Sequence, residues 1–140
     1  MRDAFKYLTS AVFVAVVVQV ALAGYGAFNT TSKADHDTST VTGKQISDGF
    51  GPHAIVGTIL IALMLILVLV AAVGRLGSPW LQWSGGIFVL GLLQMLFAFL
   101  GDSVAALGFL HAVNALAIYA AVAMLAHRAW RSQTAPPAPA

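Results

Sequence analysis

Four apolar runs, each about as long as a membrane-crossing helix, constrain the fold of this chain more than any other feature. They cover residues 7–28, 52–73, 80–100 and 104–126 of the 140 residues. An α-helix rises 1.5 Å per residue, so about 20 residues cross the roughly 30 Å hydrocarbon core of a bilayer. A bilayer offers no water to unpaired backbone groups, and the alternating pattern of a barrel strand is absent here. We therefore expect an all-α fold, an integral membrane four-helix bundle.

The composition agrees with this class and excludes several others. Hydrophobic residues make up 59% of the chain and charged residues 9%, against roughly 45–50% and about 25% in soluble domains. These values favour a multi-pass protein of a cell membrane, the inner or plasma membrane, whose surroundings are the lipid bilayer. Residues 1–131 then form one bundle with no separate soluble domain. The chain has no cysteine, which excludes disulfides and thiolate metal sites, and its net charge of +2 implies no nucleic-acid partner.

The polar segments lie between and after the runs. Residues 29–51 lack apolar periodicity, so we expect them to form an exposed external loop. Residues 132–140 are rich in Ala and Pro and are expected to be a disordered cytoplasmic tail. An alternative for the first run is a signal peptide cleaved after the small residues of Ala21–Gly24, although the run continues past that point to Phe28.

Two short motifs recur and indicate an internal repeat. "PHAIVG" around His53 in the second run resembles "LHAVNA" around His111 in the fourth, with a small residue, Gly57 or Ala115, one turn after each histidine. The first and third runs share the spacing Q-x-x-x-A-x-x-G, which places its three residues on one helical face. Its members are Gln19, Ala23 and Gly26 in the first run and Gln94, Ala98 and Gly101 in the third. The pattern predicts two repeated helical hairpins about an axis along the membrane normal, unless chance similarity between apolar helices explains it.

Such an axis would bring His53 and His111 face to face in the outer half of the bundle. Ionisable residues inside a bilayer are costly and normally have a partner, and two neutral imidazoles can supply both axial ligands of a haem iron. The candidate metal ligands are therefore His53 and His111, and the candidate cofactor is haem b. Small residues at Gly57 and Ala115 would let a flat macrocycle approach the helices. Helix N-termini, Lys33 and Lys44 are candidates to face its carboxylates.

Three further polar residues in the runs have two interpretations. Gln19, Gln94 and Asn114 either contact the cofactor or form hydrogen bonds between helices. We include them among the candidate cofactor-binding residues. No nucleophile paired with a base is evident, so no catalytic residue is assigned.

Paired histidines on the second and fourth helices resemble one four-helix half of the haem A synthase family and, more distantly, the b561-type cytochromes. The segments around Gln19, which precedes "ALAGYG", and Gln94, which precedes "MLFAFLG", are similar to the odd-numbered helices of that synthase. Four-helix proteins of uncharacterised actinobacterial families look at least as similar. That synthase uses a glutamate shortly before the first histidine of its catalytic half, where this chain has Phe50, and often has arginine where this chain has Ala54. The resemblance therefore implies haem binding by His53 and His111 without oxygenation of a haem methyl group.

These observations leave three classes of function. The first is a b-type haem protein that transfers electrons or holds haem, with a redox protein or quinone as its partner. The second is a non-haem accessory or structural subunit, and the third is a small transporter or proton relay. The runs contain no Asp or Glu, which argues against transport. Small residues on several faces would permit an oligomer.

The distribution of basic residues predicts the topology. With the N-terminus inside, five basic residues are cytoplasmic and two external, as expected from the bias of short loops. The cytoplasmic set is Arg2, Lys6, Arg75, Arg128 and Arg131, and the external set is Lys33 and Lys44. Reporter fusions at both termini should therefore report a cytoplasmic location. An external C-terminus would mean that the first run is cleaved or that one run does not span.

Overall fold

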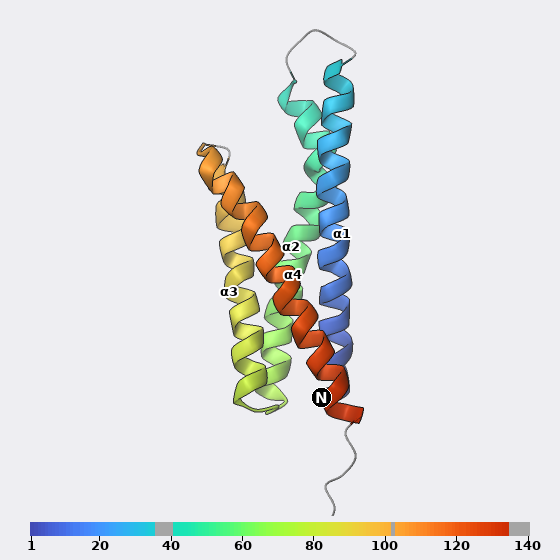
Figure 1. Ribbon diagram of the computed structural model, residues 1–140, viewed down its shortest axis with the longest axis vertical. Coiled ribbons are helices and arrows are strands. Elements are labelled where there is room, and N and C mark those ends of the chain that lie inside the picture. Colours follow the sequence, from blue (N-terminus) through green and yellow to red (C-terminus); the bar gives the residue numbers. More distant parts are fainter. Residues whose placement is uncertain (36–40, 102, 135–140) are drawn as a thin grey trace, which may run out of the picture.

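The fold is all-helical throughout the part of the chain that the computed structural model describes, residues 1–35, 41–101 and 103–134 (Figure 1). Its helices are α1 (Arg2–Asp35), α2 (Gly43–Val73), α3 (Ser78–Gly101) and α4 (Ala105–Thr134). Each of the four is long and apolar enough to cross a membrane. The predicted all-α membrane bundle is confirmed. The first three predicted spans each lie inside one helix, and the fourth begins one residue before α4.

The prediction of an external loop over residues 29–51 is wrong for most of that segment, because α1 continues to Asp35 and α2 begins at Gly43. A capping box starts α2: the Thr42 hydroxyl accepts a bond from the Gln45 backbone N–H, and the Gln45 side chain accepts one from the Thr42 N–H. Close contact between the backbones then holds the extension together, since a Cβ at Gly49 would lie 3.0 Å from the Gly26 carbonyl oxygen. Most of this polar segment is therefore helical.

The predicted C-terminal tail also begins too early, because α4 continues to Thr134. The rest of that tail, residues 135–140, lies outside the described residues.

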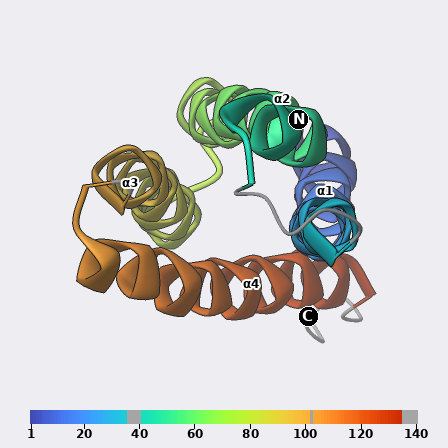
Figure 2. The same cartoon turned by 90° about the horizontal axis from the view of Figure 1, so that it is seen from above.

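The helices form two antiparallel hairpins that cross each other. α1 pairs with α2 and α3 pairs with α4, while α4 also packs on α1 and α2 on α3. Viewed from the side, α4 begins beside the end of α3 and finishes against the start of α1 (Figure 1), and the view along the bundle agrees (Figure 2). The hairpins therefore pack together at the end that holds the N-terminus and diverge at the other end.

Most buried core residues of one hairpin have a buried equivalent in the other. Pairing Gln19 with Gln94 relates each residue of α1 to one of α3 by a constant difference in residue number. Pairing His53 with His111 relates α2 to α4 by a second constant difference. Under these two differences nearly every buried core position in one hairpin meets a buried position in the other. The pairs are Thr9 and Ser84, Val12 and Ile87, Val16 and Gly91, Leu60 and Ile118, Met64 and Val122, Leu67 and Leu125, and Ala71 and Ala129. The hairpins are thus structural repeats.

Equivalent residues meet where the repeat axis passes through the bundle. Phe5 and Trp80, which the repeat pairs with each other, form an edge-to-face contact with ring centres 5.5 Å apart. His53 and His111 meet in the same way further along the axis. Their meeting follows from the two-fold relation between the hairpins, because a residue near such an axis lies opposite its own equivalent.

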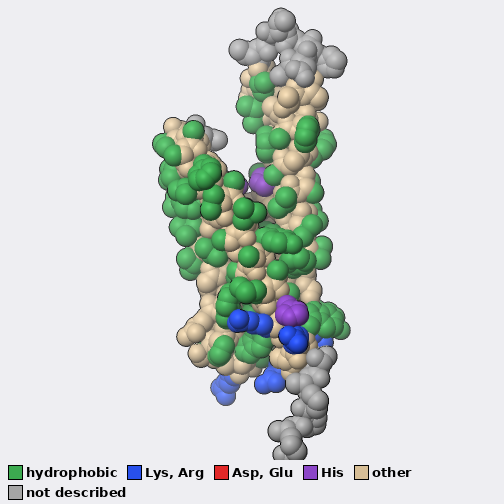
Figure 3. Space-filling view, in the orientation of Figure 1, with side chains coloured by type: hydrophobic (Ala, Val, Ile, Leu, Met, Phe, Trp, Pro, Cys, Tyr) green, Lys and Arg blue, Asp and Glu red, His purple; other side chains and the backbone are tan. Residues whose placement is uncertain are grey.

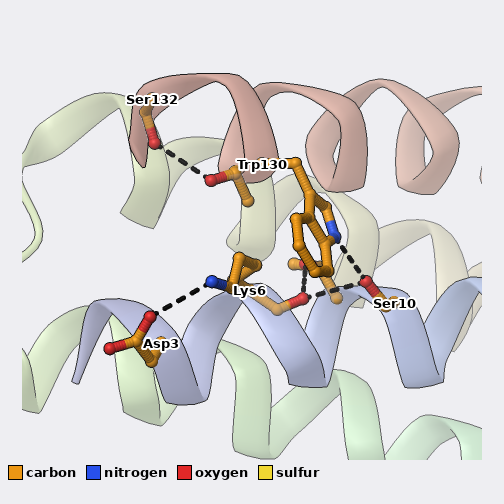
Figure 4. Close-up of polar contacts among 7 residues, drawn as sticks. Asp3, Lys6, Ser10, Trp130 and Ser132 are labelled. Atoms are coloured by element: carbon orange, nitrogen blue, oxygen red, sulfur yellow. Dashed lines mark hydrogen bonds and ion pairs between the residues drawn. The ribbon is translucent and has the colours of Figure 1, made fainter. Parts of the chain in front are cut away.

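Polar contacts join α1 to α4 at the end of the bundle that holds Arg2, Lys6, Arg75, Arg128 and Arg131, here called the basic end (Figure 4). Trp130 Nε1 donates to Ser10 Oγ at 2.9 Å, and the Lys6 ammonium lies 4.6 Å from the centre of the Trp130 ring. Lys6 is buried and also pairs with Asp3 at 3.2 Å. The ammonium is therefore neutralised where it enters the bundle.

Gly91 permits the close approach of α3 to α2. A Cβ at this position would lie 2.8 Å from Met64 Sδ and 2.9 Å from Ile61 Cδ1, and Met64 is itself fully buried. We expect Gly91→Leu to reduce stability by about 1–3 kcal/mol through overpacking, measured as a lower melting temperature in detergent. Gly85→Leu is the matched control, because nothing lies within 4 Å of a Cβ there. Equal melting temperatures for the two variants would contradict this account of the core.

Candidate functional site

The side chains of His53 on α2 and His111 on α4 face each other across the repeat axis. Their ring centres are 6.3 Å apart, the ring planes are inclined by 61°, and both residues are half-buried. The prediction that the two rings face each other is confirmed. The space-filling view is hollowed between the diverging hairpins, with histidine side chain at the floor of the notch (Figure 3).

One hydrogen bond fixes the tautomer of each ring. His53 Nδ1 lies 3.1 Å from the backbone carbonyl oxygen of Gln19, and His111 Nδ1 lies 3.0 Å from that of Gln94. A carbonyl oxygen only accepts, so each Nδ1 carries the proton and donates it. The lone pair of each neutral ring is therefore on Nε2. Among the described residues neither Nε2 has a hydrogen-bond partner.

The separation of the two ring centres matches the spacing of two axial ligands to one iron. With metal–nitrogen bonds of about 2 Å and about 1 Å from each nitrogen to its ring centre, the two ring centres should be about 6 Å apart. The observed separation is 6.3 Å. Metal-bound histidines typically donate their other ring N–H to a carbonyl or carboxylate, which holds the ring and raises its basicity. Both histidines make that bond.

Gln19, Gln94 and Asn114 form hydrogen bonds between helices. Gln19 Nε2 donates to the backbone carbonyl of His53 at 2.7 Å. Asn114 is buried, and its Nδ2 donates to Gln94 Oε1 at 2.7 Å and to the Leu90 carbonyl at 2.9 Å. The two glutamines thus position the histidine helices through side chain as well as backbone. This is the second of the two interpretations considered for these residues.

Gly57 has a different role from the one expected. A Cβ at Gly57 would lie 2.7 Å from Gln19 Nε2, so the missing side chain makes room for the Gln19 amide. The space beside this glycine is therefore already filled, and it is not where a macrocycle would lie. Ala115, its equivalent on α4, is half-buried.

The N-terminus of α2, one of the groups expected to face the haem carboxylates, is not close to His53. α2 begins at Gly43, which places its N-terminus about 15 Å along the helix from His53 at 1.5 Å per residue. Lys44 pairs with Asp48 at 2.7 Å. The correction follows from the longer helices, because the sequence pattern set the start of α2 too near its histidine.

Phe50 is a site residue that the sequence analysis treated only as a missing glutamate. Its ring centre is 6.4 Å from that of His53 in an edge-to-face contact, and the same ring fills the space beside Gly26. The equivalent position on α4 is Gly108, whose backbone lies against Gly101. The site is therefore walled by an aromatic ring on the first hairpin and by bare backbone on the second. Comparing the repeats position by position would have revealed this difference.

The equivalence of the hairpins also identifies an unmatched polar atom. Gln94 Oε1 accepts from Asn114, but the position equivalent to Asn114 on α2 is Val56. Gln19 Oε1 is buried and has no hydrogen-bond partner among the residues that the structure describes. The first hairpin thus lacks one interhelical bond that the second has.

Asn114→Val should therefore leave Gln94 Oε1 unpaired, as Gln19 Oε1 is now. We expect a loss of about 1 kcal/mol, the scale of interhelical hydrogen bonds in membranes, measured by thermal unfolding in detergent. Adding Val56→Asn should recover part of the loss by supplying a donor to Gln19. A double variant that melts below Asn114→Val would show that the two positions are not equivalent.

No protein-family model, no curated protein and no solved structure matches this chain. The resemblance to the haem A synthase family, drawn from His53, His111, Gln19 and Gln94, therefore remains a prediction.

Proposed function

We propose that this chain is a membrane b-type haem protein in which His53 and His111 supply both axial ligands to one iron. The observation that carries the proposal is the facing pair of rings, 6.3 Å apart at their centres. Support also comes from the Nδ1 bonds to the Gln19 and Gln94 carbonyls, which leave both Nε2 lone pairs available.

Two protein ligands are sufficient for such a site, because the porphyrin supplies the other four nitrogens. Within the described residues no group of three or more His, Asp or Glu side chains could hold a bare metal ion. The pair therefore suits a metal that arrives already bound in a macrocycle better than a free ion, which normally takes four or more ligands.

The side of the histidines where the two hairpins diverge also suits a flat cofactor. The buried apolar residues shared by the two hairpins lie between His53 and His111 and the basic end, from Leu60 to Ala71 on α2 and from Ile118 to Ala129 on α4. On the other side of the histidines the hairpins diverge (Figure 1). A macrocycle held between the two rings would extend toward the hollow that the space-filling view shows there (Figure 3).

Haem held by two imidazoles would supply one-electron exchange between ferric and ferrous iron, with both axial positions filled. The chain's own residues would hold the rings through backbone carbonyls and limit the access of water through the surrounding apolar helices. With both termini cytoplasmic, the site would lie in the outer leaflet and exchange electrons with a redox protein or a quinone. The function proposed is electron transfer or haem holding, without a catalytic step.

A second candidate, the non-haem accessory subunit, is favoured by the same Nδ1 bonds. Each histidine already joins its helix to the neighbouring odd helix, and interhelical hydrogen bonds of this kind stabilise membrane bundles without any cofactor. This candidate predicts a protein whose histidines affect stability only.

The visible spectrum separates the two candidates. Protein produced with ample haem and purified in detergent should show the spectrum of a low-spin b-type haem, oxidised and after reduction with dithionite. His53→Ala and His111→Ala should each abolish this spectrum or make it high-spin, because one strong ligand is lost.

His127→Ala is the matched control, because His127 is exposed at the far end of α4. His36→Ala, in a segment outside the described residues, should also leave the spectrum unchanged. A protein that purifies without colour, or a low-spin spectrum that survives both His53→Ala and His111→Ala, would favour the accessory-subunit function.

A further inference from the structure

A groove on the outer surface of the second hairpin lies near the basic end, away from the histidine pair. It has a volume of about 430 Å³ and runs along α3 from Pro79 to Leu90, with Ala121 of α4 on its other side. Gly86 lies in the groove and is exposed. A Cβ built there has no atom of another described residue within 4 Å, apart from its chain neighbours and the backbone of its own helix. In a chain that spans a bilayer, such a surface faces lipid.

The length of the groove matches one leaflet. The rise along α3 from Pro79 to Leu90 is about 16 Å at 1.5 Å per residue, and half of a hydrocarbon core of about 30 Å is about 15 Å. A transmembrane helix from a partner crosses both leaflets, so its contact surface would continue past Leu90. A single acyl chain ends near the bilayer midplane, so its length matches that of this groove.

The end of the groove nearest the start of α3 is polar and positively charged. The Arg128 guanidinium lies 4.8 Å from the centre of the Trp83 ring, and Trp83 and Gln82 both line the groove. Tryptophan is enriched at the level of lipid headgroups. Among the described residues Arg128 has no carboxylate partner, since the ion pairs found there are Lys6 with Asp3 and Lys44 with Asp48.

We propose that this groove binds one anionic phospholipid. Its acyl chain lies against Gly86, Leu90 and Ala121, and its phosphate group lies at Arg128 with the Gln82 amide as a second donor. The apolar part of the groove would contact the acyl chain, the Trp83 ring would lie at the level of the headgroup, and Arg128 would face the phosphate. These groups follow one another along the groove in the same order as the parts of a phospholipid. The site is independent of haem, so neither proposal depends on the other.

The test is native mass spectrometry of the full chain in detergent, with palmitoyl-oleoyl phosphatidylglycerol or the phosphatidylcholine of the same chains as the probe. Gly86→Leu places a side chain in the groove, and the Cβ at this position has room. Gly85→Leu is its matched control, since a Cβ at Gly85 also has nothing within 4 Å and this residue does not line the groove. Arg128→Gln removes the cation, and its control is Arg75→Asn, which removes another charge at a positive φ of 48° that asparagine tolerates.

We expect the chain to retain phosphatidylglycerol about fivefold more than phosphatidylcholine, from about 1 kcal/mol per basic residue at an anionic surface. Gly86→Leu should lose the adducts of both lipids, and Arg128→Gln should lose the preference while keeping the adducts. Gly85→Leu and Arg75→Asn should behave like the unaltered chain.

Three results would overturn the proposal. They are equal retention of the two lipids by the unaltered chain, equal adducts on Gly86→Leu and Gly85→Leu, or a dimer mass that Gly86→Leu removes. The last result would identify the groove as an interface between two copies of this chain.

Discussion

The two-fold relation between the hairpins determines where everything else in this structure lies. A residue near the axis meets its own equivalent, so a single aromatic position per repeat gives the contact of Phe5 with Trp80. A single histidine per repeat likewise gives the facing pair of His53 and His111. The chain thus obtains a symmetric pair of imidazoles, the arrangement that a two-ligand iron site needs, from one histidine placed at the same position in each hairpin.

The hydrophobic effect does not drive helices together inside a bilayer, so close packing and hydrogen bonds between helices contribute more to stability there. Glycines provide the packing at the closest approaches, where Gly91 lies against Met64 and Gly101 against Gly108. The Gln19 and Gln94 carbonyls provide the bonds, since they hold the histidines of the neighbouring helices. The interactions that stabilise the hairpins are therefore the same ones that fix the histidine rings.

The repeats differ at the positions that surround the histidines. Phe50 faces the first histidine where the second hairpin has Gly108, and Asn114 bonds Gln94 where the first hairpin has Val56. The first hairpin also extends further from the bundle, because α1 and α2 continue past the ends of α3 and α4 (Figure 1). A cofactor held on the axis would therefore meet an aromatic wall on one side and a more open wall on the other. The groove along α3 is a further feature of the second hairpin, and its polar end lies with the basic residues that set the expected topology.

The sequence by itself determined the class of the fold, the four spans and the repeat. About 20 consecutive apolar residues admit little besides a membrane helix, and the spacing of Gln19, His53 and their equivalents expresses helical periodicity directly. The facing of the histidines could also be predicted, because it follows from the repeat. The ends of the helices could not be predicted, because a run of polar residues after a span is typical of a loop. Only the structure shows that Thr42 caps α2 and that Gly49 packs closely on Gly26. Only the tertiary structure decided that Gly57 accommodates Gln19, that Nδ1 of each histidine is the bonded nitrogen, and that Gln19 Oε1 lacks a partner. Each of these depends on which atoms of two helices distant in sequence come within hydrogen-bonding distance, and periodicity along one helix carries no information about that distance.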